Sequence, residues 1–445
     1  MGHLTGTQTI SNAVTKKSRF LFSNHAGVTG VVDSLTTSTV TLKSKYADQL
    51  TGKTLYAAGT PGILVILDGV NASDAGKTAN ITGVSGDVLT VDVDFSTTPA
   101  LADGSLVAVV PPMSFAPKLQ SGHTFNANPQ NLKDKGLTDT FDSHNTPGMV
   151  DPGGGFTAFM TTDSMGLVRI MAALVGTYKI SGTVHSMVPP ESNDGTYTEC
   201  SDLSVMVSDG DGVSDELYYA LFASSGSVNF PEAGLPTVSA QTMGAGAVRE
   251  VGGSGKEFPS GANNFDRTGI PADQDPLFTF TDVFIEMGGT FGDALTAAVD
   301  QAITAGSADI SRGSAAPRPL GNGGYTAKPV ETEHGMVWNL TRTYEDDAFR
   351  SDHWGDAPRP AKKVESRFIL KAFDPSDSAK YFEIDVPRAI VETHEPQRNG
   401  QGLMVESITV EAKHTLDGNK NPDTANPLYR VRIDNGLTTN ALTAI

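Results

Sequence analysis

The stretch with the clearest chemical potential is Ser208–Glu216, in which closely spaced carboxylates alternate with glycines. Asp209, Asp211 and Asp215 offer hard oxygen ligands at short spacing, the donor type that Ca²⁺ prefers. The spacing differs from an EF-hand, because no Glu stands at the twelfth loop position counted from Asp209. Asp-Gly is also the preferred turn chemistry of a β-hairpin. We favour a hairpin turn here and keep a weak calcium site at the three aspartates as the alternative.

No other arrangement of reactive side chains predicts catalysis or cofactor binding. Gly252–Lys256 resembles a phosphate loop, but Glu250 replaces its first glycine and Glu257 its final Ser or Thr. The nine histidines are scattered without helical ligand spacing, and Cys200 is the only cysteine, so zinc binding is not predicted. We therefore predict that the chain is not an enzyme and uses no cofactor.

The charge balance bears on possible partners. The chain holds 32 basic and 51 acidic residues, a net charge of −19, which disfavours stable binding of nucleic acid through a basic face. A protein that DNA slides past without adhering stays compatible with that charge. The single cysteine favours folding in the cytoplasm, and no apolar stretch approaches the ~20 residues that a membrane span needs.

Composition changes along the chain predict three regions. Residues 1–24 are interpreted as a polar N-terminal arm, 25–112 as a small β-barrel or sandwich, and 113–445 as one larger β domain. The middle region contains an internal echo that suits a barrel of two similar units. Its parts are Thr29–Val32, Val40–Leu42 and Gly52–Leu55, which recur as Thr82–Ser85, Leu89–Val91 and Gly104–Val107. Pro111-Pro112 then marks the predicted linker.

Hydrophobic periodicity predicts one helix among many strands in the larger domain. Leu167, Ile170, Met171 and Leu174 form an apolar stripe within a helix at Ser164–Val175. A weaker helix is predicted at Asp293–Ile303. Alternating or β-rich segments predict strands at Phe156–Met160, Leu203–Val207, Leu217–Phe222, Leu277–Phe280, Met336–Leu340, Arg367–Leu370, Phe382–Ile390, Leu403–Ala412 and Leu428–Ile433. Two Gly- and Ser-rich stretches, Gly244–Gly269 and Gly306–Gly324, are predicted to be long loops that order only between subunits.

The order of these elements resembles the tail tube proteins of long-tailed bacteriophages, over about residues 113–445. The matching stretches are Gly154–Gly176, Leu203–Phe230, Gln274–Gly289, Gly335–Asp347, Tyr381–Ile390 and Gly402–Asn435. The resemblance implies a β-sandwich of two packed sheets with a flanking short helix. The small barrel-like domain at 25–112 lies outside the usual tube fold and is interpreted as a decoration domain.

The resemblance also implies a function. Subunits of this family assemble into rings, usually hexameric, that stack into a tube through which double-stranded DNA leaves the virion without stable binding. The implied partners are other copies of the chain and other tail proteins, namely the terminator, tape measure and distal tail proteins. The implied location is the virion tail, after synthesis in the host cytoplasm, and we expect a net acidic bore. The alternative is a β-sandwich protein that decorates the virion surface or mediates adhesion.

Overall fold

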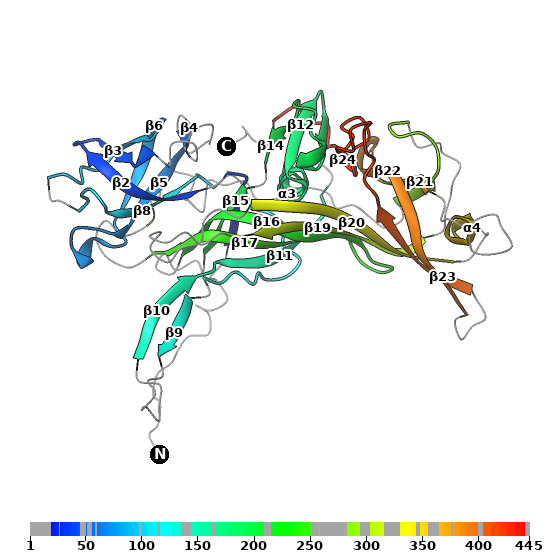
Figure 1. The fold of residues 1–445 in the computed structure, drawn as a ribbon, viewed down its shortest axis with the longest axis horizontal. Helices are drawn as coiled ribbons and strands as arrows, with labels where there is room; N and C mark the ends of the chain where they lie inside the picture. The colour runs from blue at the N-terminus through cyan, green and yellow to red at the C-terminus, as the bar shows by residue number, and fades with distance from the viewer. Residues whose placement is uncertain are drawn as a thin grey trace, which may run out of the picture. The chain divides into compact units, whose positions relative to one another are not determined.

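The chain adopts a mainly β structure in the computed structural model (Figure 1). The structure describes residues 19–25, 27–44, 50, 56–57, 60–97, 100–113, 116–127, 129–134, 144–161, 165–200, 202–208, 215–250, 258, 283–293, 303–315, 330–343, 348–354, 365–374, 377–398 and 404–440. Most of these residues lie in strands, and two α-helices occur among them. The predicted fold class is therefore confirmed at the level of a mainly β chain.

The described residues gather into two compact units. Unit one draws on Met1–Ala116, Ser204–Tyr219 and Gly246–Pro271, and unit two on Pro117–Leu203, Ala220–Ala245 and Ala272–Ile445. This division differs from the predicted boundary at Pro111-Pro112, because segments distant in the sequence join the N-terminal region. One such link is a hydrogen bond of 2.8 Å between the hydroxyls of Thr29 and Tyr219, both within unit one.

Six strands of unit one close into a barrel, as the sequence predicted. Each strand pairs antiparallel with two others, in the cyclic order β2, β3, β7, β6, β5, β8 and back to β2. The short β4 pairs with β5 at one end, and a 3₁₀ turn, η2, links β5 to β6. The bounds are β2 Val28–Leu35, β3 Thr39–Leu42, β4 Tyr56–Ala57, β5 Thr60–Asp68, η2 Ala72–Asp74, β6 Thr78–Ser85, β7 Val88–Val91 and β8 Leu106–Val110.

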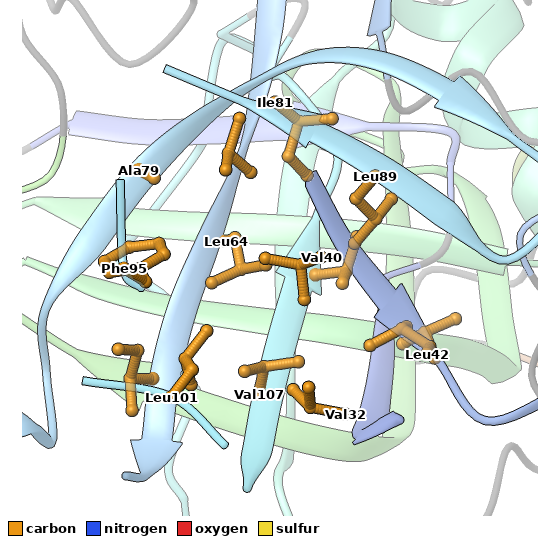
Figure 2. Packing of buried hydrophobic residues seen from close by; sticks show 14 of the residues in the cluster. Val32, Val40, Leu42, Leu64, Ala79, Ile81, Leu89, Phe95, Leu101 and Val107 are labelled. Atoms are coloured by element: carbon orange, nitrogen blue, oxygen red, sulfur yellow. The ribbon is translucent and has the colours of Figure 1, made fainter. Parts of the chain in front are cut away.

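Hydrocarbon side chains fill the barrel. Figure 2 shows Val40, Leu64 and Val107 directed into one interior, and each is almost wholly buried. The alternation of strands such as Thr39–Leu42 places every second side chain inside. All members of this core cluster are apolar, so hydrophobic burial is the main force that closes the barrel.

The internal echo is present, but its first strand is aligned differently from the sequence prediction. Val40–Leu42 does correspond to Leu89–Val91, since both form the second strand of a hairpin. In the first strand, however, Val32 corresponds to Ile81, because each lies opposite the last residue of that second strand. The sequence prediction matched Thr29–Val31 with Thr82–Val84 because both read Thr-Gly-Val. This match is shifted by four residues from the correspondence in the structure. Gly52–Leu55 lies outside the described residues, and β5 is the third strand of the first repeat of the barrel.

Part of the predicted N-terminal arm is a strand instead. β1, Arg19–Ser23, pairs antiparallel with β15, Asp202–Ser208. Phe20, Leu21 and Phe22 are all buried, and burial of three large apolar side chains favours an ordered strand over a solvated arm. The first 18 residues of the predicted arm lie outside the described part of the chain.

A large curled sheet lies mainly in unit two, although Glu216–Tyr219 of β16 and Gly246–Arg249 of β17 are counted with unit one. From β16 its strands follow the order β16, β19, β20, β23, β22, β24, β13, β12, β14, while β17 joins β11 to β16 and β21 joins β18 to β22. A separate hairpin consists of β9 and β10. The bounds are β9 Pro129–Asp134, β10 His144–Val150, β11 Gly153–Phe159, β12 Thr177–Ser181, β13 Val184–Met187, η3 Pro190–Ser192, β14 Thr198–Glu199, β16 Glu216–Phe230, β17 Thr237–Arg249, β18 Val283–Met287, β19 Ile303–Ala315, β20 Val330–Thr343, β21 Glu365–Asp374, β22 Asp377–Arg398, β23 Met404–Ala412 and β24 Arg430–Asp434.

The predicted helix is confirmed as α3, Met165–Val175, and all of its residues after Met165 are buried. It ends at Gly176, which has a φ of 97° and donates its backbone N–H to the carbonyl of Ala172 at 2.9 Å. A residue with such a φ is usually glycine, because a Cβ is strained there. Arg312 of β19 also donates to the carbonyl of Ala173 at 2.6 Å, where a cation complements the helix dipole.

Both predicted long loops are wrong in their described parts. Gly244–Arg249 completes β17, and Gly306–Ala315 belongs to β19. These residues pair within one chain, so they do not wait for a neighbouring subunit to become ordered. The rest of each predicted loop lies outside the described residues, apart from Glu250 and Phe258.

Most of the other predicted elements are confirmed in position. Strands occur where alternation predicted them, although β16, β20 and β22 are much longer than the predicted segments. A short helix that was not predicted, α4, spans Ala348–Trp354. The predicted strand at Leu277–Phe280 lies outside the described residues, as does the predicted helix at Asp293–Ile303 apart from its two end residues.

Candidate functional site: the polar face of the large sheet

Four adjacent strands of unit two, β16, β19, β20 and β23, present two chemically different faces. Because side chains alternate across a strand, paired residues form rows that cross all four strands on one face. One such row, Val228, Ala308, Trp338 and Val410, is fully buried. The neighbouring row, Asn229, Ser307, Asn339 and Thr409, points the other way and is exposed or half-exposed.

We call this second surface the polar face. Most of its residues carry short polar side chains, and none of them is buried. Its members are Ser225, Ser227, Asn229, Ala305, Ser307, Asp309, Ser311, Gly335, Val337, Asn339, Thr341, Thr343, Val405, Ser407, Thr409 and Glu411.

A shallow groove of about 290 Å³ lies on the polar face. Side chains lining it include Asn229, Ser307, Asn339, Ser407 and Thr409. The Asn339 side chain donates to Asp309 Oδ2 at 3.0 Å and accepts from Thr409 Oγ1 at 3.4 Å. The groove therefore offers neutral hydrogen-bonding groups, with one carboxylate beside it.

The charge of the polar face is acidic. Asp309 and Glu411 are its only ionisable members among the positions defined above, and none of those positions holds Lys or Arg. Lys413, which follows β23, forms an ion pair with Glu411. A phosphate backbone binds mainly through Lys and Arg, so the polar face lacks the groups that would hold DNA.

Directly beneath this face lies a buried ionic cluster. Arg342 of β20 donates through Nε to Glu406 Oε2 of β23 at 2.6 Å. His394 of β22 contacts the other oxygen of Glu406 at 2.8 Å. The Arg342 guanidinium also lies 4.6 Å from the ring centre of Phe349 in α4. These contacts fix the register of β20, β22 and β23 at the end of the polar face. A one-residue slip would leave a buried charge without its partner.

The polar face has no arrangement for covalent catalysis among its described residues. Its hydroxyl groups belong to Ser and Thr, and a nucleophilic hydroxyl needs a base within hydrogen-bond reach. No histidine belongs to the face. His394 of the neighbouring strand β22 lies on the opposite side of the sheet, where it contacts Glu406. What the arrangement can do is present a wide, hydrated and weakly acidic surface.

The sequence-predicted calcium residues are only partly described. Asp209 and Asp211 lie outside the described residues. Asp215 is buried at the start of β16, and its backbone carbonyl accepts from the N–H of Glu250 at 2.8 Å. Within the described part of the chain, no group of three or more His, Cys, Asp or Glu residues could hold a metal ion. A calcium site at the three aspartates stays a prediction.

Sequence reasoning missed the polar face because its residues resemble loop residues. Ser, Ala and Gly dominate β19, and Ser and Gly are residues that usually mark turns. The period-two signal was nevertheless present in Ser307–Ser311, where Ala308 and Ile310 alternate with polar residues.

In comparisons with known proteins, no protein-family model and no curated protein matches the chain. In the described residues, neither helix has the length and apolar character that a membrane-spanning helix needs.

Proposed function

We propose that the chain is a structural virion protein that polymerises into stacked rings and forms the tail tube of a long-tailed bacteriophage. The proposal includes the finer architecture of that family, two packed β-sheets with a flanking helix, and α3 supplies a candidate for that helix. It also includes hexameric rings, contacts with terminator, tape measure and distal tail proteins, and a place in the virion tail.

The observation that carries the proposal is the polar face. A conduit for DNA must keep phosphates hydrated and mobile, and charge is felt over about 8–10 Å at physiological salt. A surface of short polar side chains, on which Asp309 is acidic and Glu411 is paired with Lys413, presents few groups that would hold phosphate. We assign the polar face to the bore of the assembled tube.

Electron microscopy of the purified full chain tests the assembly directly. We expect rings with a central hole, and tubes at high protein concentration. Compact monomers would contradict the proposal and would favour the alternative of a surface decoration or adhesion protein.

The assignment of the face is tested separately by adding positive charge. Asn229→Lys and Asn339→Lys place a cation at exposed positions of one cross-strand row. Assembled particles of either variant should gain salt-dependent DNA binding, with a slope of about −0.9 in log K against log salt for each new phosphate contact.

The matched control is Asn419→Lys, which makes the same charge change at an exposed position after β23. Particles of this variant should bind DNA as weakly as the natural protein. Equal DNA binding by all three variants would overturn the assignment of the polar face to the bore, whatever the state of assembly.

A further inference from the structure

The strand pairing of the barrel maps onto itself when its two halves are exchanged. The first half consists of β2, β3 and β5, and the second of β6, β7 and β8. Each half begins with a hairpin, β2–β3 or β6–β7. Between the halves, β5 pairs with β6 as β8 pairs with β2, and the two remaining seams join β3 to β7 and β5 to β8. Exchange of the halves therefore converts every pairing into a pairing that also exists.

The register and the irregularities of the two hairpins also coincide. In the first hairpin Val32 lies opposite Leu42, and β2 then contains one extra residue. In the second, Ile81 lies opposite Val91, and β6 contains one extra residue at the same place. A β-bulge is a specific local feature that twists its strand. Its recurrence at equivalent positions therefore argues that the two halves are not similar merely because both have β-rich sequences.

The barrel core follows the same correspondence. Five inward residues of the first half have an apolar, buried counterpart in the second half, and Figure 2 shows members of both sets around one interior. Val28, which also belongs to the core, corresponds to Lys77 instead. The corresponding pairs are Val32 with Ile81, Val40 with Leu89, Leu42 with Val91, Leu64 with Val107, and Ile66 with Val109.

Size compensation at one position strengthens the equivalence. A Cβ added to Gly30 would lie 2.7 Å from Cδ1 of Leu42, which is closer than carbon atoms approach. At the corresponding place in the second half, Ala79 carries that Cβ and the smaller Val91 replaces the leucine. Each half thus fills the same space with a different division between two neighbouring side chains.

The two inward sets are equal in total size. Converting the first set into the second needs six substitutions, of which three add one carbon and three remove one. We infer that the barrel is a tandem duplication of one unit, a hairpin followed by a strand, and that each unit binds its copy through the pairings β3–β7, β5–β8, β5–β6 and β2–β8. The partner that each half fits is a second copy of itself, which is a self-complementary interface of the kind found in two-fold dimers.

A full-length variant with a symmetric core tests this inference. It gives the first half the inward residues of the second, through Gly30→Ala, Val32→Ile, Val40→Leu, Leu42→Val, Leu64→Val and Ile66→Val. The matched control contains the same set of side chains in a different order, through Gly30→Ala, Val32→Leu, Leu42→Ile, Leu64→Val and Ile66→Val. Hydrogen exchange followed by mass spectrometry reports the stability of the barrel strands within the whole chain.

We expect exchange of the barrel amides in the symmetric variant to stay within about threefold of the natural chain, and to rise at least about tenfold in the control, because misplaced volume strains a packed core. Equal acceleration in both variants would overturn the inference. If neither variant folds, a pair of double variants tests the inference. Leu42→Val should reverse the faster exchange caused by Gly30→Ala, whereas Leu89→Val combined with Gly30→Ala should not. Failure of that specific reversal also overturns it.

Discussion

The barrel and the large sheet are both antiparallel, yet they bury different material. The core cluster of the barrel consists of hydrocarbon side chains, while Asp74 of η2, which links β5 to β6, is buried and paired with Lys77. The large sheet buries ionised groups between its strands, among them Arg342, Arg367, Glu383, Asp385 and Glu406, and each of these is at most 3% exposed. Two β-structures in one chain thus reach order by different means, apolar fit in one and paired charges in the other.

The second buried network of the large sheet shows how such pairing works. Asp385 of β22 accepts from Arg367 of β21 through Nε at 2.7 Å and Nη2 at 2.9 Å. It also accepts from Arg430 of β24 at 3.3 Å. On the same face of β22, Glu383 contacts Lys371 and Arg432, which lie directly opposite it in the two neighbouring strands.

The difference concerns how each region specifies its register. In the barrel, period-two alternation and two bulges suffice, because only one register fills the interior with methyl groups. In the large sheet the outward face is small and polar, so apolar patterning is weaker. Buried ion pairs at paired positions then penalise a slip, since an unpaired buried charge costs several kcal/mol.

The largest expected effect comes from removing one partner of a buried pair. Asp385→Ala should lower the free energy of unfolding by about 3–5 kcal/mol, because it leaves the buried Arg367 without its carboxylate. The only tryptophans are Trp338 and Trp354, both in unit two. Denaturant titration followed by tryptophan fluorescence therefore reports this unit alone.

Its control removes both charges. Asp385→Leu combined with Arg367→Met should lose much less stability than Asp385→Ala, because no buried charge stays unpaired. If the double variant is as unstable as the single one, the pair acts through side-chain packing and the contrast with the barrel fails.

A smaller decrease in the free energy of unfolding should appear at acidic pH. Burial lowers the pKa of His185, although hydrogen bonding to Asn435 opposes the shift. Its ring is held between Tyr178 Oη at 2.8 Å and Asn435 Oδ1 at 3.0 Å. The folded state therefore favours the neutral ring. The stability this contributes is present above the unfolded value of ~6.5 and is lost as pH falls below it through the lowered pKa.

The measurement is the slope of unfolding free energy against pH, again by tryptophan fluorescence. One proton contributes at most about 1.4 kcal/mol per pH unit, and His185→Gln should remove that part of the slope. Hydrogen exchange of the barrel strands should not respond to His185→Gln, since His185 lies in unit two. An unchanged slope in the variant would show that other groups control the acid response.

Sequence reasoning succeeded where apolar periodicity was strong. The barrel, α3 and strands such as β15 and β23 were predicted from alternating or helical patterns. It failed in Gly244–Arg249 and Gly306–Ala315, which read as loops. There the glycines serve close packing: a Cβ on Gly244 would meet Leu221 at 2.4 Å, and one on Gly306 would meet Leu340 at 3.0 Å. Composition alone does not distinguish a glycine that turns the chain from one that admits a large neighbour.

The polar face was not predictable for a related reason. Its rows combine residues from distant parts of the chain, such as Asn229, Ser307 and Asn339, and only strand pairing brings them together. The buried ion pairs were equally hidden, because a charged residue in a sequence is usually solvated. Arg342 and Glu406 become a pair only once β20 and β23 are known to be neighbours.

The smallest expected effect comes from an exposed ion pair on the strand that also holds Asp385. Arg388 of β22 binds Glu365 of β21 in bidentate fashion, at 2.8 and 2.9 Å, with side chains 37% and 28% exposed. Glu365→Gln should lower the free energy of unfolding by only about 0.2–1 kcal/mol, because water already screens both groups. Part of that loss should vanish in 1 M salt. Arg388 also keeps its bond to the carbonyl of His414 at 2.6 Å in the variant. A loss of stability as large as that of Asp385→Ala would mean that burial does not determine how much each ion pair contributes. The geometry of the pairs would then have to explain their contribution to the large sheet.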